Sequence, residues 1–315
     1  MNALERAGLD VAADGGPPLT IDARLLDRVD YARTIGPVEL LAERLVVRCE
    51  DADLGAFLAA FLASARPVAD ARCFLCIVRW GDRWAAYRDG VRTLSVTSVP
   101  AMARALVWDL NVTALAAPTD RTQLHAAVVA RDGRAMILPG VSGAGKSTLA
   151  LTLAASGWEY FSDEVAALDA DELLVHPYPR PIALDPGSWG LFPASLLQWP
   201  EGFPDLVSDL RLVLASSLGA HGPPAPDIPT WVVFPKVVPG AQTSLEAISK
   251  GEAVRRLVAL CFNLGTTGRR GVDQLVRVVN ATTCRQLVLD GVTAVPGVLA
   301  ALTGDSSHPS LDHGV

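Results

Sequence analysis

The chain has 315 residues, of which 50% are hydrophobic and 19% charged, and this is enough to bury the cores of two domains. Its net charge of −7 comes with no basic cluster, which argues against binding to nucleic acid or to an anionic membrane surface. The apolar runs are interrupted well before the roughly 20 residues that span a bilayer, and the N-terminus lacks the apolar core of a signal peptide. The five cysteines are too scattered for a disulfide framework, so we expect a protein of the reducing cytoplasm.

The first part of the chain is predicted to be a small α+β domain over residues 21–117, after a flexible tail at residues 1–20. Its expected elements are a strand ending at Leu45–Arg48, a helix over Leu54–Ala65, a hairpin of Cys73–Arg79 with Trp84–Arg88, and a helix over Val99–Leu110 that carries Pro100 in its first turn. We find no catalytic motif in this domain, which therefore serves to bind a partner or to brace the domain that follows.

Cys73 and Cys76 have the C-x-x-C spacing of zinc and redox sites. No second cysteine pair or nearby histidine accompanies them in the sequence, and they lie in the apolar run Cys73–Val78. A structural place in the core is therefore favoured over zinc or redox chemistry.

The second part of the chain carries the most informative motif, a full G-x-x-x-x-G-K-S match at Gly140–Ser147. It follows the apolar run Ala135–Leu138, which predicts a strand, and precedes a helix-favouring segment that ends at Gly157. Strand, glycine-rich loop and helix form the setting in which backbone N–H groups and a helix N-terminus bind phosphate. The alternative is a glycine-rich turn ahead of an ordinary helix.

Residue types in this motif also favour nucleotide binding. Lys146 is one of three lysines among 27 basic residues, and a lysine is the compact charge that suits the β- and γ-phosphates. The Ser147 hydroxyl is a candidate ligand of Mg²⁺. The residues expected to bind nucleotide are Gly140, Val141, Ser142, Gly143, Ala144, Gly145, Lys146, Ser147 and Thr148.

Two acidic residues, Asp163 and Glu164, lie 17 and 18 positions after Lys146, one helix and one predicted strand later. This short spacing returns a carboxylate pair to the phosphates without a further crossover. One carboxylate can accept a hydroxyl proton while the other orients that hydroxyl or holds metal. The alternative is a solvated turn between two strands.

His125 begins the apolar run Leu124–Ala130, which the turn Arg131–Arg134 joins to the strand before the glycine-rich loop. A lone histidine at a strand start is most often structural. Its place beside the loop makes it a candidate site residue as well.

His125, the Gly140–Ser147 loop and the Asp163-Glu164 pair together resemble the catalytic domain of HPr kinase/phosphorylase, in which a histidine, a P-loop and a tandem acidic pair follow in this order. Other segments resemble bacterial HprK-related kinases of the kinase A type: His176–Leu184, Ser249–Ala253 and Cys261–Gly265. The resemblance implies an α/β (α+β) fold, with a P-loop HPr kinase/PEP carboxykinase-like mixed-sheet domain over residues 118–303.

By the same resemblance, Asp163 is the base that acts on a substrate serine, and Glu164 and His125 support it. Lys146 and Ser147 match the lysine and serine of the family's P-loop, and the metal is expected at Ser147 and Glu164. The chain departs from the enzyme at Glu164, where the enzyme has Asp, and at Ala126, where it has Gly. Pro177–Leu184 replaces the enzyme's Glu- and Gly-rich segment, so the reverse reaction and HPr as substrate are not implied.

The rest of this domain offers weaker signals. Arg180 lies in the proline-rich passage Pro177–Pro181, where it is either a phosphate clamp or a surface residue. Residues 185–230 are expected to form a long, partly irregular insertion that faces substrate. The arginines of Gly268–Gly271 lie either near the phosphates or, as we favour, in an exposed turn before a helix over Val272–Asn280. Residues 304–315 are expected to be a disordered tail.

These observations predict an ATP- and Mg²⁺-dependent kinase that phosphorylates a serine on a small protein or peptide. We expect no nucleic-acid or membrane partner, and the resemblance suggests a homo-oligomer. Two alternatives stay open, a small-molecule kinase and a regulatory module that binds ATP without transferring phosphate. The acidic pair favours a kinase, because a pure binder needs no base so close to its lysine.

Overall fold

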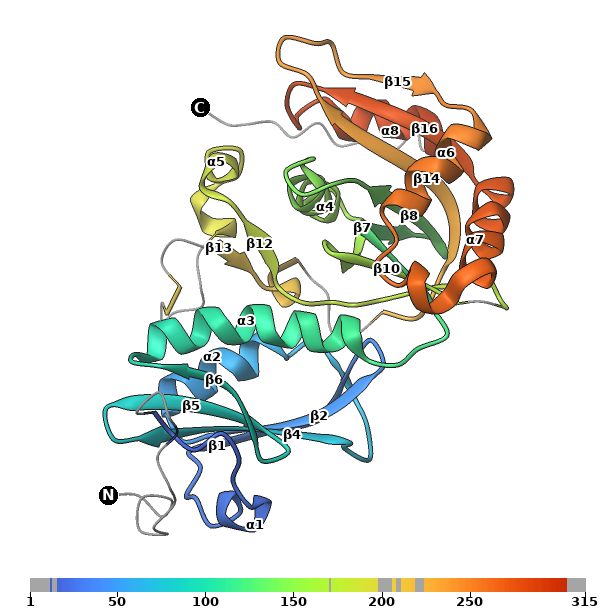
Figure 1. Cartoon of the computed structure of the whole chain (residues 1–315). Coiled ribbons are helices and arrows are strands. Elements are labelled where there is room, and N and C mark those ends of the chain that lie inside the picture. Colours follow the sequence, from blue (N-terminus) through green and yellow to red (C-terminus); the bar gives the residue numbers. More distant parts are fainter. Residues whose placement is uncertain are drawn as a thin grey trace. The chain divides into compact units, whose positions relative to one another are not determined.

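The computed structural model describes residues 12, 16–169, 171–197, 206–207, 211–218 and 224–304. The chain divides into two compact units, whose segments can be followed by colour in Figure 1. The first unit holds Met1–Thr119, Pro193–Ser217 and His221–Pro223, and the second holds Asp120–Phe192, Leu218–Ala220 and Pro224–Val315. The expectations for most of the first 15 residues, for the middle of residues 185–230 and for residues 305–315 lie outside the described residues.

The first unit contains a mixed sheet in the order β3-β1-β2-β4-β5-β6, in which only β2 and β4 are parallel neighbours. The strands are β1 (Arg33–Leu40), β2 (Glu43–Cys49), β3 (Arg66–Pro67), β4 (Cys73–Trp80), β5 (Arg83–Arg88) and β6 (Val91–Val96). Parallel neighbours need a crossover connection, and α2 (Ala52–Phe61) lies in the one between β2 and β4. The unit also contains α1 (Ala23–Leu26) and α3 (Val99–Ala116).

Helix α3 extends six residues past the expected end at Leu110. Asn111, Val112 and Thr113 are weak helix formers, which is why the sequence suggested an earlier end. Packing outweighs this preference, since Thr113 and Ala114 are buried and the Thr113 hydroxyl donates a 2.7 Å hydrogen bond to the Asp109 carbonyl. Cys73 and Cys76 are buried free thiols of β4, so the prediction of a core position is confirmed.

The second unit contains a mixed sheet in the order β11-β10-β7-β8-β14-β16-β15, with β9 paired to β7. Strands β8, β14 and β16 are mutually parallel, and the other pairings are antiparallel. The strands are β7 (Thr122–Arg131), β8 (Arg134–Pro139), β9 (Glu159–Ser162), β10 (Val165–Leu168), β11 (Val175–His176), β14 (Ile228–Val237), β15 (Ser244–Ala247) and β16 (Thr283–Leu289). The expected α/β composition with a mixed sheet is therefore present.

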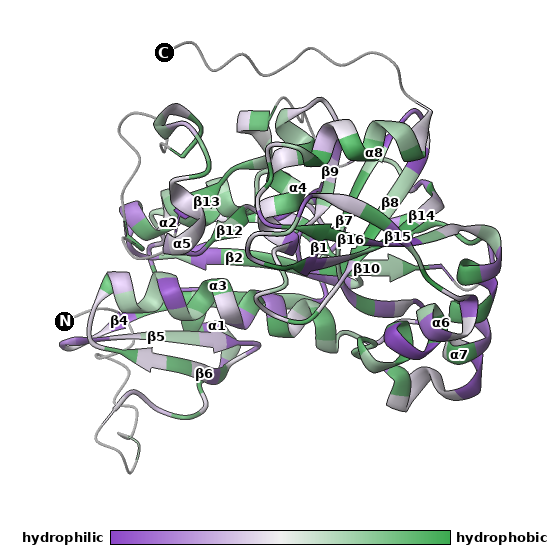
Figure 2. Ribbon diagram, turned by 90° about the horizontal axis from the view of Figure 1, so that it is seen from above, coloured by the Kyte–Doolittle hydropathy of each residue, from purple (hydrophilic) through white to green (hydrophobic). Residues whose placement is uncertain are grey.

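Helices complete the second unit. They are α4 (Lys146–Ala155), α5 (Pro186–Trp189), α6 (Lys250–Ala259), α7 (Leu264–Ala281) and α8 (Val295–Thr303). Buried residues of β7, β8, β10 and β14 share one apolar cluster with α6 and α7. Figure 2 shows hydrophilic residues along α6 and α7, whereas α8 is mainly hydrophobic. The amphipathic helices thus present their apolar faces to the core.

The expected exposed turn at Gly268–Gly271 coincides with a break inside α7, where Gly268, Arg269 and Arg270 are exposed. Gly268 has φ 54° and ψ −134°, a conformation accessible essentially to glycine, and it kinks the helix at this point. Two helical segments therefore meet at Gly268, and the second begins directly after it, slightly earlier than the expected start at Val272.

Short elements lie in the described parts of residues 182–218. They are β12 (Ile182–Leu184), 3-10 helices at Ala194–Leu196 and Ala215–Leu218, and β13 (Arg211–Val213). Among the described residues, no helix is both long and apolar enough to cross a membrane.

Candidate active site

The glycine-rich loop joins the end of β8 to the start of α4, where the sequence placed it. A Cβ on Gly140 would lie 2.9 Å from the Cβ of Ala144, which is closer than real side chains approach. Gly143 and Gly145 have φ of 78° and 83°, in the left-handed region that favours glycine. The loop thus needs its glycines to curl tightly ahead of the helix N-terminus, whose free N–H groups attract anions.

Lys146 is buried within this loop, with only 6% of the residue exposed. Its ammonium group donates a 3.0 Å hydrogen bond to the Val141 carbonyl, which is across the loop. Burial lowers the pKa of Lys146, although the charges of Glu164 and Asp163 act against this shift. An ammonium group that is already poorly hydrated is well placed to gain from a phosphate ligand.

His125 reaches the loop through the register of the β7–β8 hairpin. Asp132 and Gly133, with φ of 51° and 71°, make the turn, and Ala126 pairs with Pro139. The Gly140 N–H then donates a 3.2 Å hydrogen bond to the His125 carbonyl. Burial lowers the pKa of His125 to about 4, with help from the Lys146 charge, so the imidazole is neutral at neutral pH.

The acidic pair lies at an interruption between β9 and β10, and both of these strands pair antiparallel with β7. The chain therefore keeps its direction through Asp163 and Glu164 instead of reversing. Ser162 stabilises the interruption, because its hydroxyl accepts hydrogen bonds from the N–H groups of Glu164 and Val165. The alternative of a solvated turn is wrong, since Asp163 is 1% exposed.

Four donors surround the Asp163 carboxylate, two on each oxygen. On Oδ2 they are the Ser147 hydroxyl at 2.9 Å and the Ala183 N–H at 3.4 Å, and on Oδ1 the Tyr160 hydroxyl at 3.1 Å and the Arg180 Nε at 3.2 Å. A carboxylate has about four lone-pair sites, so the acceptor capacity of Asp163 is fully used. Tyr160 is itself buried, and burial, together with the Asp163 charge, raises the pKa of its hydroxyl.

Arg180 connects the two acidic residues. Its Nε lies 3.2 Å from Asp163 Oδ1, and one terminal nitrogen lies 3.1 Å from Glu164 Oε2. Only 10% of its side chain is exposed, so the alternative of a surface arginine is wrong. Burial acts to lower its pKa, but the nearby carboxylates outweigh this effect and raise it, which keeps the guanidinium charged. Arg180 was a candidate phosphate clamp, but in this structure its guanidinium binds the Asp163 and Glu164 carboxylates.

Glu164 has a more open environment than Asp163. Its side chain is 27% exposed, and Oε1 lies 3.9 Å from His125 Nε2, beyond hydrogen-bonding distance. Burial raises the pKa of Glu164, whereas the Arg180 charge lowers it. Because His125 is neutral, its contact with Glu164 is not an ion pair at neutral pH.

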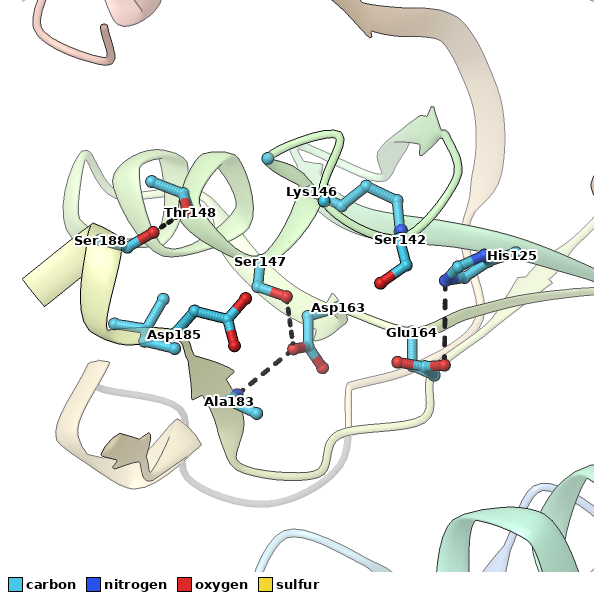
Figure 3. Close-up of a pocket in the computed structure, with 13 residues that line it drawn as sticks. His125, Ser142, Lys146, Ser147, Thr148, Asp163, Glu164, Ala183, Asp185 and Ser188 are labelled. Carbon is cyan, nitrogen blue, oxygen red and sulfur yellow. Dashed lines mark hydrogen bonds and ion pairs between the residues drawn. The ribbon is translucent and has the colours of Figure 1, made fainter. Parts of the chain in front are cut away.

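These groups line one cavity of about 280 Å³ in the second unit (Figure 3). His125, Lys146, Ser147, Asp163 and Glu164 all contribute to it, so the structure brings the predicted catalytic residues together. Of the expected nucleotide-binding loop, Ser142, Gly143, Gly145 and Thr148 also line the cavity.

The sequence interpretation missed the opposite wall of this cavity. Asp185, the N-cap of α5, and Ser188, within α5, lie there, and the Thr148 and Ser188 hydroxyls are 3.0 Å apart. In Figure 3 the Asp185 carboxylate points toward Ser147. Both residues lie in the segment that was expected to face substrate, but no local motif marked them.

The oxygen groups around Ser147 suit a hard divalent cation. The Ser147 hydroxyl is hydrogen-bonded to Asp163, and the Glu164 carboxylate is hydrogen-bonded to Arg180. The two residues expected to bind the metal are therefore each hydrogen-bonded to another residue and not to one another. Among the described residues, no group of three or more His, Cys, Asp or Glu side chains is arranged to hold a metal ion. Mg²⁺ at nucleotide sites commonly needs only one or two carboxylates besides phosphate and water, so Ser147 and Asp185, which line the same cavity, are candidates for this role.

Neither a protein-family model nor a curated protein matches the chain.

Proposed function

We propose that the chain is an ATP-dependent phosphotransferase that moves the γ-phosphoryl group to a hydroxyl, and that its natural acceptor is a serine on a small protein or peptide. One observation carries the proposal: residues of the glycine-rich loop, Lys146 among them, line the same cavity as the Asp163-Glu164 pair. A module that only binds nucleotide needs the loop but has no use for a pair of carboxylates across from it.

The residues of the cavity divide into two functions. The glycine-rich loop and the N-terminus of α4 supply N–H donors for phosphate oxygens, and Lys146 supplies a positive charge for the transferred group. The carboxylate pair accepts the proton of the acceptor hydroxyl. Positioning and charge stabilisation of this kind provide most of the catalysis in phosphoryl transfer.

In this proposal Ser147 and Asp185 hold Mg²⁺. When bound, the ion neutralises charge on the phosphates. Asp163 accepts the Ser147 hydroxyl hydrogen bond and thereby fixes the direction of that oxygen.

The proposal includes the HPr kinase-like fold type and a cytoplasmic setting. A P-loop after β8, a mixed sheet and an antiparallel strand that carries His125 support the fold assignment. All five cysteines are free thiols, which supports a reducing compartment. Assembly into a homo-oligomer belongs to the same resemblance.

The test is to incubate the purified full-length chain with γ-labelled ATP, Mg²⁺ and an extract of its host, and to follow the label. We expect label on one small protein or peptide. Lys146→Met should lower transfer by at least about 100-fold, because it removes a charge that acts on the transferred group. Lys250→Met is the matched control, since Lys250 is exposed and, in the described part of the chain, its ammonium group donates hydrogen bonds to Asn280, away from the loop.

Each of the other outcomes identifies a different protein. Label on a small metabolite would replace the protein kinase with a small-molecule kinase. Tight ATP binding without transfer to any component would leave a regulatory nucleotide-binding module in its place.

A further inference from the structure

We propose that Glu164, not Asp163, accepts the proton of the acceptor hydroxyl, and that Asp163 is a positioning residue that holds Ser147 and Arg180 in place. This assignment rests on the proposed phosphotransferase function. It reverses the roles that the sequence resemblance implies for the two acids.

The first argument is the accessibility of the two carboxylates. The Asp163 side chain is 0% exposed, whereas that of Glu164 is 27% exposed, and both line the same cavity. A base must approach within hydrogen-bonding distance of the proton that it removes. Glu164 meets this condition without any movement of the surrounding chain.

The second argument is acceptor capacity. Both oxygens of Asp163 already accept two hydrogen bonds each, so an incoming hydroxyl would have to displace one of the four donors. Three of these donors are fixed in place, because Tyr160 and Arg180 are buried and Ala183 lies in strand β12. Displacing any of them would leave a polar group without a partner, which is costly in a buried site.

Glu164 has acceptor capacity to spare. Arg180 occupies Oε2, and within the described part of the chain no hydrogen-bond donor reaches Oε1. His125 Nε2 lies 3.9 Å from this oxygen, on the cavity side, so an acceptor hydroxyl that enters here meets both groups. Figure 3 shows the His125 ring and the Glu164 carboxylate facing each other, apart from the contact between Ser147 and Asp163.

The reaction step then balances as follows. The acceptor O–H bond breaks and its proton passes to Oε1 of Glu164, while the acceptor oxygen forms a bond to the γ-phosphorus of ATP. The bond from that phosphorus to the β,γ-bridging oxygen breaks, and its electron pair leaves with ADP. Lys146 stays positively charged beside the phosphates throughout.

Chemical rescue tests this assignment more directly than loss of activity. The probe reaction is release of inorganic phosphate from ATP by the purified full-length chain, with water as the acceptor, together with label transfer in host extract. We expect Glu164→Ala to lower kcat by about 100- to 1,000-fold while the dissociation constant for a fluorescent ATP analogue changes less than about twofold. Added formate should restore at least about tenfold of that loss, because a small carboxylate can enter the space left by the side chain and take the proton.

Asp163→Ala provides the matched comparison. We expect weaker nucleotide binding and no rescue by formate, because the missing group positions Ser147 and Arg180 rather than taking the proton. Should Asp163→Ala fail to fold, the Glu164 variants decide alone: Glu164→Asp should keep more activity than the isosteric Glu164→Gln. Formate rescue of Asp163→Ala, or a wild-type kcat in Glu164→Gln, would overturn the assignment.

Failure of the proposed function gives a different result. A wild-type chain that binds ATP but neither hydrolyses it nor transfers its phosphate would refute both proposals. An active wild-type chain with an active Glu164→Gln variant would refute only the assignment of the base.

Discussion

At the scale of single residues, the site combines two carboxylates that are adjacent in sequence but differ in environment. Asp163 is enclosed and fully hydrogen-bonded, whereas Glu164 faces the cavity with one oxygen open. Arg180 lets the two negative charges lie side by side, since it donates to one oxygen of each. The arginine is therefore as much a part of the site as the acids.

Arg180→Met should destabilise the fold strongly. Removing the guanidinium leaves the buried Asp163 carboxylate without its compensating charge, which typically costs about 3–5 kcal/mol of the free energy of unfolding. Urea unfolding of both proteins measures the difference. Arg255→Met is a suitable control, because Arg255 is 70% exposed and, among the described residues, its ion pair is with Glu252 alone, so we expect no measurable change in stability. A loss for Arg180→Met no larger than that of the control would mean that the Asp163 charge does not need its partner.

His125 should make stability depend on pH in a defined window. Its pKa falls from 6.5 to about 4 on folding, so between these values the unfolded chain binds a proton that the folded chain does not. Protonation in this range favours the unfolded chain. The free energy of unfolding is therefore unaffected by His125 above pH 6.5 and falls as pH decreases from 6.5 toward 4. Allowing for partial exposure of the ring, we expect wild type to lose about 1 kcal/mol more than His125→Gln between pH 7 and pH 5. Urea midpoints at the two pH values provide the measurement, and equal losses in the two proteins would show that the imidazole titrates normally.

At the scale of elements, strand register assembles the site. Strand β7 pairs with β8 on one side and with β9 and β10 on the other. His125 therefore lies beside Gly140 on one side and opposite Val165 on the other. Three short stretches that are separate in the sequence meet because they share one strand.

The sequence predicts the local parts of this arrangement and not its long-range contacts. The glycine-rich loop, the β7–β8 turn and α4 follow from residue types within a few positions of each other. Arg180 reaches Asp163 from 17 positions away, through a proline-rich passage whose direction no local preference determines. Asp185 escaped notice for the same reason, because its role depends on where α5 lies rather than on its neighbours in sequence.

Gly140→Ala tests whether the loop requires its tight curl. The new Cβ would lie 2.9 Å from the Cβ of Ala144, so the loop must open to admit it. We expect ATP affinity to fall at least about tenfold, by the loss of aligned N–H donors, with little loss of global stability. Gly251→Ala is the control, because no atom of the described residues lies within 4 Å of a Cβ at that position in α6, and it should leave affinity unchanged. Isothermal titration with ATP and Mg²⁺ measures both, and unchanged affinity in Gly140→Ala would show that the loop tolerates a wider shape.

At the scale of the whole molecule, the chain divides into two compact units, and the described residues of each contain an apolar cluster. In the first unit a cluster joins β4 and β5 with residues around α1, and in the second a cluster lies between the mixed sheet and α6 and α7. All residues of the candidate site belong to the second unit. A ligand of the site should therefore stabilise that unit in particular.

Calorimetry can test this expectation on the full-length chain. We expect two unfolding transitions, of which ATP with Mg²⁺ raises only one. At 100 times the dissociation constant the ligand contributes about 2.7 kcal/mol, which corresponds to about 5–10 °C for a unit of this size. Lys146→Met should abolish the shift, because the Lys146 ammonium group bonds the loop carbonyl of Val141. Lys250→Met should keep it, because Lys250 bonds Asn280 instead. A single transition that moves as a whole would show that the units unfold together, and no movement of either transition would mean that the loop does not bind ATP.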